Sequence, residues 1–308
     1  MAFTAKDVAE LRKQTGCGMM DCKNALVEAD GDFQKAIKVL REKGIAASEK
    51  KAGRIAAEGL VDIYTENGAT AMIEVNSETD FVAKNDSFRA FVRGLCKTIL
   101  ANRPADVAAL NACKYDDSDD TVEAVFQEKT FTIGEKLSLR RFLIVDGIVS
   151  TYVHGIGATG VIVKFDTDEA TAAKAEFAEM AKNVALQVAA MNCTYTTKED
   201  VPASVVEEEK AILLKQMEQD PKMANKPEVA LKKIIEGKIG KFYDTNCLVE
   251  QEYVKDGNMK VGAYVASVAK ALGADIKVVA FYRYEKGEGL QKREENFAEE
   301  IANMVNKA

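Results

Sequence analysis

A single polar stretch decides the fold predicted for this chain: Asn76-Ser77-Glu78-Thr79-Asp80-Phe81-Val82-Ala83-Lys84-Asn85-Asp86-Ser87-Phe88. Before it, the alternation of apolar side chains from Ala69 to Val75 predicts a β-strand, and Asn67-Gly68 is a strong turn signal at its start. After it, three- and four-residue spacing predicts a helix that Asn85 or Asp86 can cap. The buried stripe of this helix would consist of Phe88, Phe91, Val92, Leu95 and Ile99. On the strand, we expect Ala71, Ile73 and Val75 on one face and Met72 on the other.

The strand-to-helix connection carries a large aromatic residue, Phe81, beside a carboxylate, Asp80. A polar loop can present such a pair to a binding partner. In the other interpretation, Asp80 or Thr79 caps a short turn and Phe81 packs into the core, where aromatic side chains more often lie.

An internal repeat helps to decide between these interpretations. The segment Gly68-Ala69-Thr70-Ala71-Met72-Ile73 recurs as Gly157-Ala158-Thr159-Gly160-Val161-Ile162, at an offset of 89 residues. The same offset carries Phe88 onto Phe177 and Leu95 onto Val184, so we expect one register through strand, connection and helix. The repeat predicts two related subdomains, each an antiparallel sheet with helices on one face, as in α+β proteins.

The repeat also separates what the two copies share from what only one of them has. At the same offset, Asp80 and Phe81 align with Glu169 and Ala170. A phenylalanine that the core required should have a bulky counterpart in the second copy, and Ala170 is small. The comparison therefore favours an exposed Phe81.

The whole chain predicts an α+β architecture that begins with a three-helix bundle, whose third helix would start at the cap Asp32 and stop at Gly44. Strands from Leu137 to Val145 and from Ile148 to His154 are expected to pair through a turn at Asp146-Gly147. The expected units are the bundle at 1–45, a basic helical linker at 46–57, a first core subdomain at 58–146, a second at 147–290 with a helical hairpin at 202–243, and a C-terminal helix at 291–308.

Composition narrows the class of protein. The chain has 308 residues, 47% of them hydrophobic, and a net charge of −7. That charge argues against nucleic-acid binding as the main activity, because phosphate binding draws on clustered Lys and Arg. The six cysteines include no Cys-x-x-Cys pair, so we expect neither a zinc site nor a disulfide framework. Without a signal segment or a run of about 18 apolar residues, we expect a cytoplasmic protein with no membrane span.

Motifs for catalysis are scarce. The sole histidine, His154, is near no cysteine or serine motif and is interpreted as a polar residue at a strand end. The sequence has neither a Gly-x-x-x-x-Gly-Lys-Ser/Thr loop nor a Gly-x-Gly-x-x-Gly after a strand. We therefore expect a protein that is not an enzyme and that holds no cofactor or metal.

Two long motifs resemble a known family. They are Thr15-Gly16-Cys17-Gly18-Met19-Met20-Asp21-Cys22-Lys23-Asn24-Ala25-Leu26 and Thr79-Asp80-Phe81-Val82-Ala83-Lys84-Asn85. Both closely resemble the bacterial elongation factor Ts family, the guanine nucleotide exchange factors of elongation factor Tu. The resemblance continues through Ile133-Gly134-Glu135-Lys136, Arg140-Arg141, Tyr152-Val153-His154, Lys241-Phe242-Tyr243 and Gly287-Glu288-Gly289.

The resemblance implies a set of contacts with elongation factor Tu. A UBA-like N-terminal bundle would dock on the GTPase domain through Arg12, Met19 and Met20. The residues expected near the magnesium and nucleotide site of the partner are Thr79, Asp80, Phe81 and Val82. Ile133 and Gly134 would form a further contact, and the second subdomain would grip another domain of the partner.

One position departs from the family pattern. The chain has Leu186-Gln187-Val188-Ala189-Ala190 where the family commonly has Met-His-Ile-Ala-Ala. The resemblance therefore predicts that Gln187 takes over the partner contact of that histidine or that the contact is lost. It leaves open whether the complex is a 2:2 assembly.

Two alternatives belong to other functional classes. An RNA-binding or scaffold protein could use the basic linker, with Lys50, Lys51 and Arg54, together with the helical hairpin. An enzyme would require a clustered acid–base or metal site. Neither alternative accounts for an aromatic-carboxylate pair present in one copy of the repeat alone.

Overall fold

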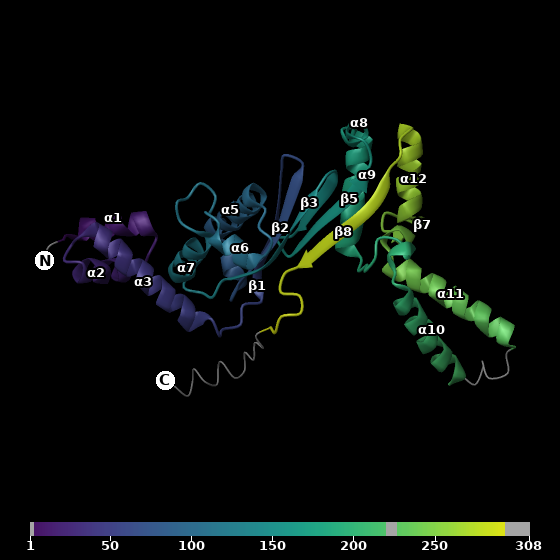
Figure 1. Ribbon diagram of the computed structural model, residues 1–308, viewed down its shortest axis with the longest axis horizontal. Coiled ribbons are helices and arrows are strands. Elements are labelled where there is room, and N and C mark those ends of the chain that lie inside the picture. The colour runs from purple at the N-terminus through teal and green to yellow at the C-terminus, as the bar shows by residue number, and fades with distance from the viewer. Residues whose placement is uncertain (1–2, 220–226, 293–308) are drawn as a thin grey trace.

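The computed structural model describes residues 3–219 and 227–292, so the predicted C-terminal helix lies almost wholly outside the described residues. The chain forms an α+β molecule, as predicted from the sequence. Its overall shape is elongated (Figure 1). A three-helix bundle occupies one end, two small antiparallel sheets occupy the middle, and a helical hairpin projects at the other end.

The N-terminal bundle consists of α1 (Ala5–Thr15), α2 (Met19–Glu28) and α3 (Phe33–Lys51). A capping box between Thr4 and Asp7 starts α1, and Asp32 caps α3. The predicted stop at Gly44 is wrong, because α3 continues to Lys51. Gly44 is buried within this helix and faces Phe131 of a later helix. The first residues of the predicted linker thus form the end of α3.

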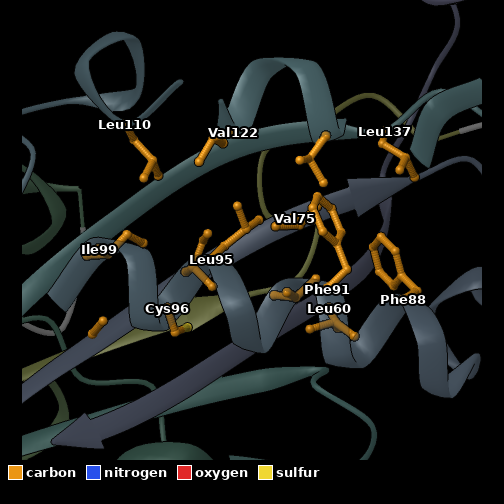
Figure 2. Packing of buried hydrophobic residues seen from close by; sticks show 14 of the residues in the cluster. Leu60, Val75, Phe88, Phe91, Leu95, Cys96, Ile99, Leu110, Val122 and Leu137 are labelled. Atoms are coloured by element: carbon orange, nitrogen blue, oxygen red, sulfur yellow. The ribbon is translucent and has the colours of Figure 1, made fainter. Parts of the chain in front are cut away.

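The first core subdomain is a sheet of order β1-β2-β3 covered by helices on one face (Figure 1). The tight turn at Asn67-Gly68 joins the first two strands, and Asn85 caps the main helix by accepting from the N–H groups of Ser87 and Phe88. Figure 2 shows the stripe of this helix packed against the sheet. The elements are β1 (Glu58–Glu66), β2 (Ala69–Ser77), α4 (Asp80–Ala83), α5 (Asp86–Asn102), α6 (Val107–Ala112), α7 (Val122–Ile133) and β3 (Ser138–Asp146).

The second core subdomain is a sheet of order β4-β5-β8 packed against α9 and α12. The predicted hairpin at 202–243 is confirmed as α10 and α11, whose facing sides bury Leu213, Met217, Ile235 and Ile239. The elements are β4 (Val149–His154), β5 (Thr159–Asp166), α8 (Glu169–Ala172), α9 (Ala175–Ala190), η1 (Lys198–Asp200), α10 (Ala203–Glu218), α11 (Glu228–Asn246), η2 (Leu248–Glu250), β6 (Glu252–Tyr253), β7 (Asp256–Lys260), α12 (Val261–Leu272) and β8 (Lys277–Glu285).

The predicted pairing through Asp146-Gly147 is wrong. Both strands exist, but β3 pairs with β2 and β4 pairs with β5, so the chain passes from one sheet to the other at this turn. The two sheets pack together through Val61, Ile63, Met72, Val145 and Ile162. Gly160 permits this approach, because a Cβ there would lie 2.5 Å from Val61 Cγ1.

The two subdomains repeat the same plan, but the strands do not keep the predicted offset of 89. Glu66 corresponds to His154, an offset of 88, and Ala69 corresponds to Thr159, an offset of 90, because the second hairpin has a longer turn. The offset of 89 holds for α4 with α8 and for the stripe residues of α5 and α9. A slip of one residue moves side chains to the other face of a strand. The helix-facing residues are accordingly Ala71, Ile73 and Val75 in β2, and Val161, Val163 and Phe165 in β5.

Candidate functional site

The predicted polar connection after β2 is a one-turn helix, α4, rather than an open loop. Val82 and Ala83 are buried and anchor the turn, whereas the Phe81 side chain is 77% exposed. The interpretation in which Phe81 packs into the core is therefore wrong, and the exposed interpretation is confirmed. The burial of Val82 and Ala83 thus keeps the large apolar side chain of Phe81 exposed to solvent.

The base of α4 is fixed by a distant part of the chain. Thr79 makes no side-chain cap; its N–H and Oγ1 instead donate to the two carboxylate oxygens of Glu135, at 2.9 and 2.6 Å. The neighbouring Glu78 carboxylate accepts from the Lys136 N–H at 2.5 Å and from Arg54 at 3.1 Å. The segment between α7 and β3 thus holds both residues that precede Asp80.

This segment contains two further predicted site residues. Ile133 ends α7 and packs, half-buried, against the first core, and Gly134 caps the helix in the left-handed conformation with φ 84°. Both directly precede Glu135. The structure therefore links Ile133 and Gly134 to the Asp80–Phe81 turn through Thr79. Glu135 and Lys136 were not predicted as supports of the turn, although both belong to the motif Ile133-Gly134-Glu135-Lys136.

Lys84 holds the two exposed side chains of the turn. Its Nζ lies 2.5 Å from Asp80 Oδ2 and 5.7 Å from the centre of the Phe81 ring. The hydrogen bond from Lys84 lowers the pKa of Asp80, and the charges of Lys84 and Lys286 act in the same direction. Asp80 is therefore an anion at neutral pH, beside an exposed ring.

A pocket of about 550 Å³ lies beside the turn. Ile55, which is partly exposed, adds a second apolar side chain to Phe81 at this surface. The pocket is lined by Ile55, Ala57, Glu58, Glu78, Thr79, Asp80, Phe81 and Lys292.

The three residues predicted to dock the N-terminal bundle are all exposed. Arg12 is exposed on α1, and Met19 and Met20 are 44% and 61% exposed at the start of α2. The N-cap residue Gly18 has no side chain to cap α2, so the two methionines lie at a helix N-terminus without a side-chain cap. Flexible methionine side chains suit a surface that adapts to a partner.

Gln187 differs from its prediction, because its side chain is fully buried in α9. Its Nε2 donates to Gln251 Oε1 at 3.2 Å and to the carbonyl of Glu252 at 3.1 Å, and its Oε1 accepts from the Val254 N–H at 2.9 Å. An amide so engaged is not available to a partner. The structure places Gln187 inside the fold and so favours the second expected outcome, in which the partner contact at this position is lost.

Other kinds of site find little support in the described residues. His154 is exposed at the end of β4 and shares a hydrogen bond with Tyr152. Across residues 3–219 and 227–292, no cluster of three or more His, Cys, Asp or Glu could hold a metal ion. In the same ranges, no helix is long and apolar enough to cross a membrane.

An exposed aromatic residue and a fixed carboxylate, on a turn that is anchored by its buried neighbours, are typical of a surface that binds another protein.

Comparisons with known proteins identify the family. The model of the family described as Elongation factor TS matches residues 78–288. The chain is 42% identical to Elongation factor Ts of Syntrophotalea carbinolica, and the match covers 99% of this chain and 100% of the relative. It is 45% identical to Elongation factor Ts of Clostridioides difficile, with 98% of this chain and 99% of the relative covered. It is 47% identical to Elongation factor Ts of Symbiobacterium thermophilum, with 97% of each chain covered. The chain belongs to the elongation factor Ts family.

Proposed function

We propose that the protein is a guanine nucleotide exchange factor of translation elongation in the cytoplasm, with elongation factor Tu as its partner. The observation that carries the proposal is the 77% exposed Phe81 beside the anionic Asp80. These residues, with Thr79 and Val82 as their support, enter the partner near its magnesium and nucleotide. Arg12, Met19 and Met20 dock the N-terminal bundle on the same partner.

The mechanism requires no covalent chemistry from this chain. Magnesium demands near-octahedral geometry and depends on a supporting shell, so a wedge that displaces this shell weakens nucleotide binding. By linkage, a factor that weakens nucleotide binding is itself bound more weakly when nucleotide is present. Each tenfold weakening corresponds to about 1.4 kcal/mol of coupling. Incoming GTP then displaces the factor.

The alternative of RNA binding through the basic linker is disfavoured by internal contacts. Lys51 Nζ donates to the carbonyl of Thr130 at 3.0 Å, and Arg54 pairs with Glu78 at 3.1 Å. Burial, followed by the charge of Arg54, lowers the pKa of Lys51. These two side chains support the fold around the turn instead.

The test is the release of fluorescent GDP from elongation factor Tu. Wild type should accelerate release, and the double variant Asp80→Ala, Phe81→Ala should do so at least roughly 100-fold less while still binding the partner. Glu169→Ala is the matched control, because it removes the carboxylate at the corresponding position of α8. Unchanged GDP release with wild-type protein would exclude the exchange function.

A further inference from the structure

A fully buried carboxylate, Glu74 on β2, joins the two core subdomains. Its Oε1 accepts from Arg140 at 2.9 Å and from the Gly287 N–H at 2.8 Å, and its Oε2 accepts from Arg141 Nε at 2.7 Å. Asn76 Nδ2 donates to Oε1 as well, at 3.1 Å. The bond to Gly287 connects β2 to the turn that follows β8, in the second subdomain.

The cluster keeps this carboxylate ionised. Burial alone would raise the pKa of Glu74, but the bonds from Gly287, Arg140, Asn76 and Arg141 outweigh burial and hold the pKa below its ordinary value. Arg141 also pairs with the Glu288 carboxylate at 3.1 Å and stacks over the Tyr284 ring at 4.0 Å, and Arg140 donates to the Glu288 carbonyl. The motifs Arg140-Arg141 and Gly287-Glu288-Gly289 thus meet at one buried anion.

The backbone around Glu74 has a counterpart in the second sheet that carries no such cluster. A β-bulge between Glu74 and Val75 sets Arg141 opposite Glu74 and leaves Arg140 as the extra residue, so both guanidinium groups reach one carboxylate. The second sheet has the same bulge between Lys164 and Phe165, with Ala280 opposite Lys164 and Val279 as the extra residue. Alanine and valine form no ion pairs, so the same backbone is built without the cluster.

Buried ion pairs are weak evidence for stability, because desolvation offsets much of their attraction and apolar replacements often stabilise. The second copy has Lys164 at the corresponding position and no ion cluster there, so the cluster of the first copy is better explained by the segments that it holds in place. From Glu74, β2 runs to Ser77, whose hydroxyl donates to the Thr79 carbonyl at 2.8 Å at the base of α4.

The other side of the cluster leads to the same turn. Gly287 has φ 70°, and a Cβ there would lie 2.2 Å from the Ala57 carbonyl oxygen. Its neighbour Lys286 pairs with Glu58. Ala57 and Glu58 line the pocket beside Asp80 and Phe81, so the cluster holds two walls of that pocket together.

We propose that Glu74 is a positioning residue, which fixes the Asp80–Phe81 turn by clamping β2 to the segment after β8. Its effect on nucleotide exchange rests on the proposed function. Its effect on the turn itself does not, and can be measured on the protein alone.

The first experiment uses the absence of tryptophan from this sequence. Phe81→Trp places the single tryptophan of the chain on the turn, and time-resolved anisotropy of tryptophan, excited selectively over the nine tyrosines, measures its motion with Glu74 or with Glu74→Gln. We expect a larger amplitude of motion in the Gln variant. Ala170→Trp, on α8, is the matched control and should show no change. Equal motion at position 81 in both backgrounds would overturn the proposal.

Arg140→Met is the second variant, should Glu74→Gln fail to fold. Its side chain is 23% exposed, and its removal leaves Arg141 and Gly287 on the carboxylate. We expect the same direction of change in the motion of the fluorophore at position 81, with a smaller amplitude. No change in a folded Arg140→Met protein would count against the clamp.

The second experiment is a double-mutant cycle in the exchange assay. With Phe81 present, Glu74→Gln should slow maximal GDP release roughly tenfold at saturating factor; with Phe81→Ala, the same change should matter less than about twofold. Independent, additive effects would overturn the proposal. If wild type does not accelerate release, the exchange function fails, and the anisotropy measurement still decides whether Glu74 positions the turn.

Discussion

The two core subdomains carry the same one-turn helix at the same place, with Phe81 exposed on α4 and Ala170 exposed on α8. The turns are also held differently. In the second copy, Asp168 caps α8 itself by accepting from the Thr171 N–H at 2.9 Å and from its hydroxyl at 2.7 Å. In the first copy, Thr79 occupies the corresponding position and binds Glu135 instead. The first turn therefore depends on a distant residue for its support, whereas the second turn is capped by its own neighbour in the chain.

The largest expected effect is a loss of stability when a core residue that both subdomains share is truncated. Phe88 and Phe177 occupy corresponding positions in the stripes of α5 and α9, and both are buried. Phe88→Ala and Phe177→Ala should each lower the free energy of unfolding by about 3–5 kcal/mol, through lost burial and a cavity. Urea denaturation measures both values. A loss below about 1 kcal/mol at either site would break the equivalence of the two cores.

The next largest expected effect is on GDP release, and it should differ between the residues that support α4 and α8. Glu135→Ala leaves the Thr79 N–H and hydroxyl without their acceptor, so α4 should lose its fixed position and GDP release should slow roughly tenfold. Asp168→Ala removes the corresponding cap of α8 and should leave release unchanged. Thermal denaturation of both variants is the control for folding. Equal slowing by both variants would mean that the support of α4 has no special part in exchange.

A further prediction concerns Glu74, whose position in the second copy is taken by Lys164. The folded-state pKa of Glu74 is depressed below its ordinary value of 4.5, so its stabilisation is present above about pH 4.5 and is lost as pH falls through the folded pKa. Wild type should therefore lose more stability than Glu74→Gln as the pH falls from 6 to 3, because only wild type has a carboxylate that must take up a proton at this position. Urea denaturation across this range measures the difference. If the stabilities of wild type and Glu74→Gln changed in parallel with pH, the Glu74 carboxylate would have the same pKa in the folded and unfolded states, contrary to the prediction.

Local features of this fold were predictable from the sequence, and non-local ones were not. The Asn85 cap, the stripe of α5 and the Asn67-Gly68 turn are set by neighbours in the chain. The exposure of Phe81 could be predicted because the repeat supplied Ala170 for comparison. The predicted offset of 89 residues was wrong for the strands because the two hairpin turns differ in length. The sequence similarity across Gly68 and Gly157 does not reveal this difference, which decides the face of the strand on which each side chain lies.

The errors at other positions have the same origin. Asp146-Gly147 has the composition of a tight hairpin turn, but β3 finds its partner in β2, far earlier in the chain. Gln187 was assigned from its place in a motif, whereas its burial is set by Gln251, Glu252 and Val254, which follow the helical hairpin. Glu135 supports Thr79 across 56 residues of sequence, a distance that no local pattern spans.

The smallest expected effect concerns Lys84, which has only Ala173 as its counterpart in the second copy. The Lys84–Asp80 pair is exposed, and such pairs contribute little to stability, so Lys84→Ala should shift the melting temperature by less than about 2 °C. Exchange should nevertheless slow about two- to fivefold, because Asp80 and Phe81 lose the side chain that orients both. Lys84→Arg keeps the charge over the ring and should restore most of the rate. If Lys84→Ala and Lys84→Arg both exchange at the wild-type rate, the anchoring of α4 by Val82, Ala83 and Glu135 suffices by itself, and the two copies differ in function through Phe81 alone.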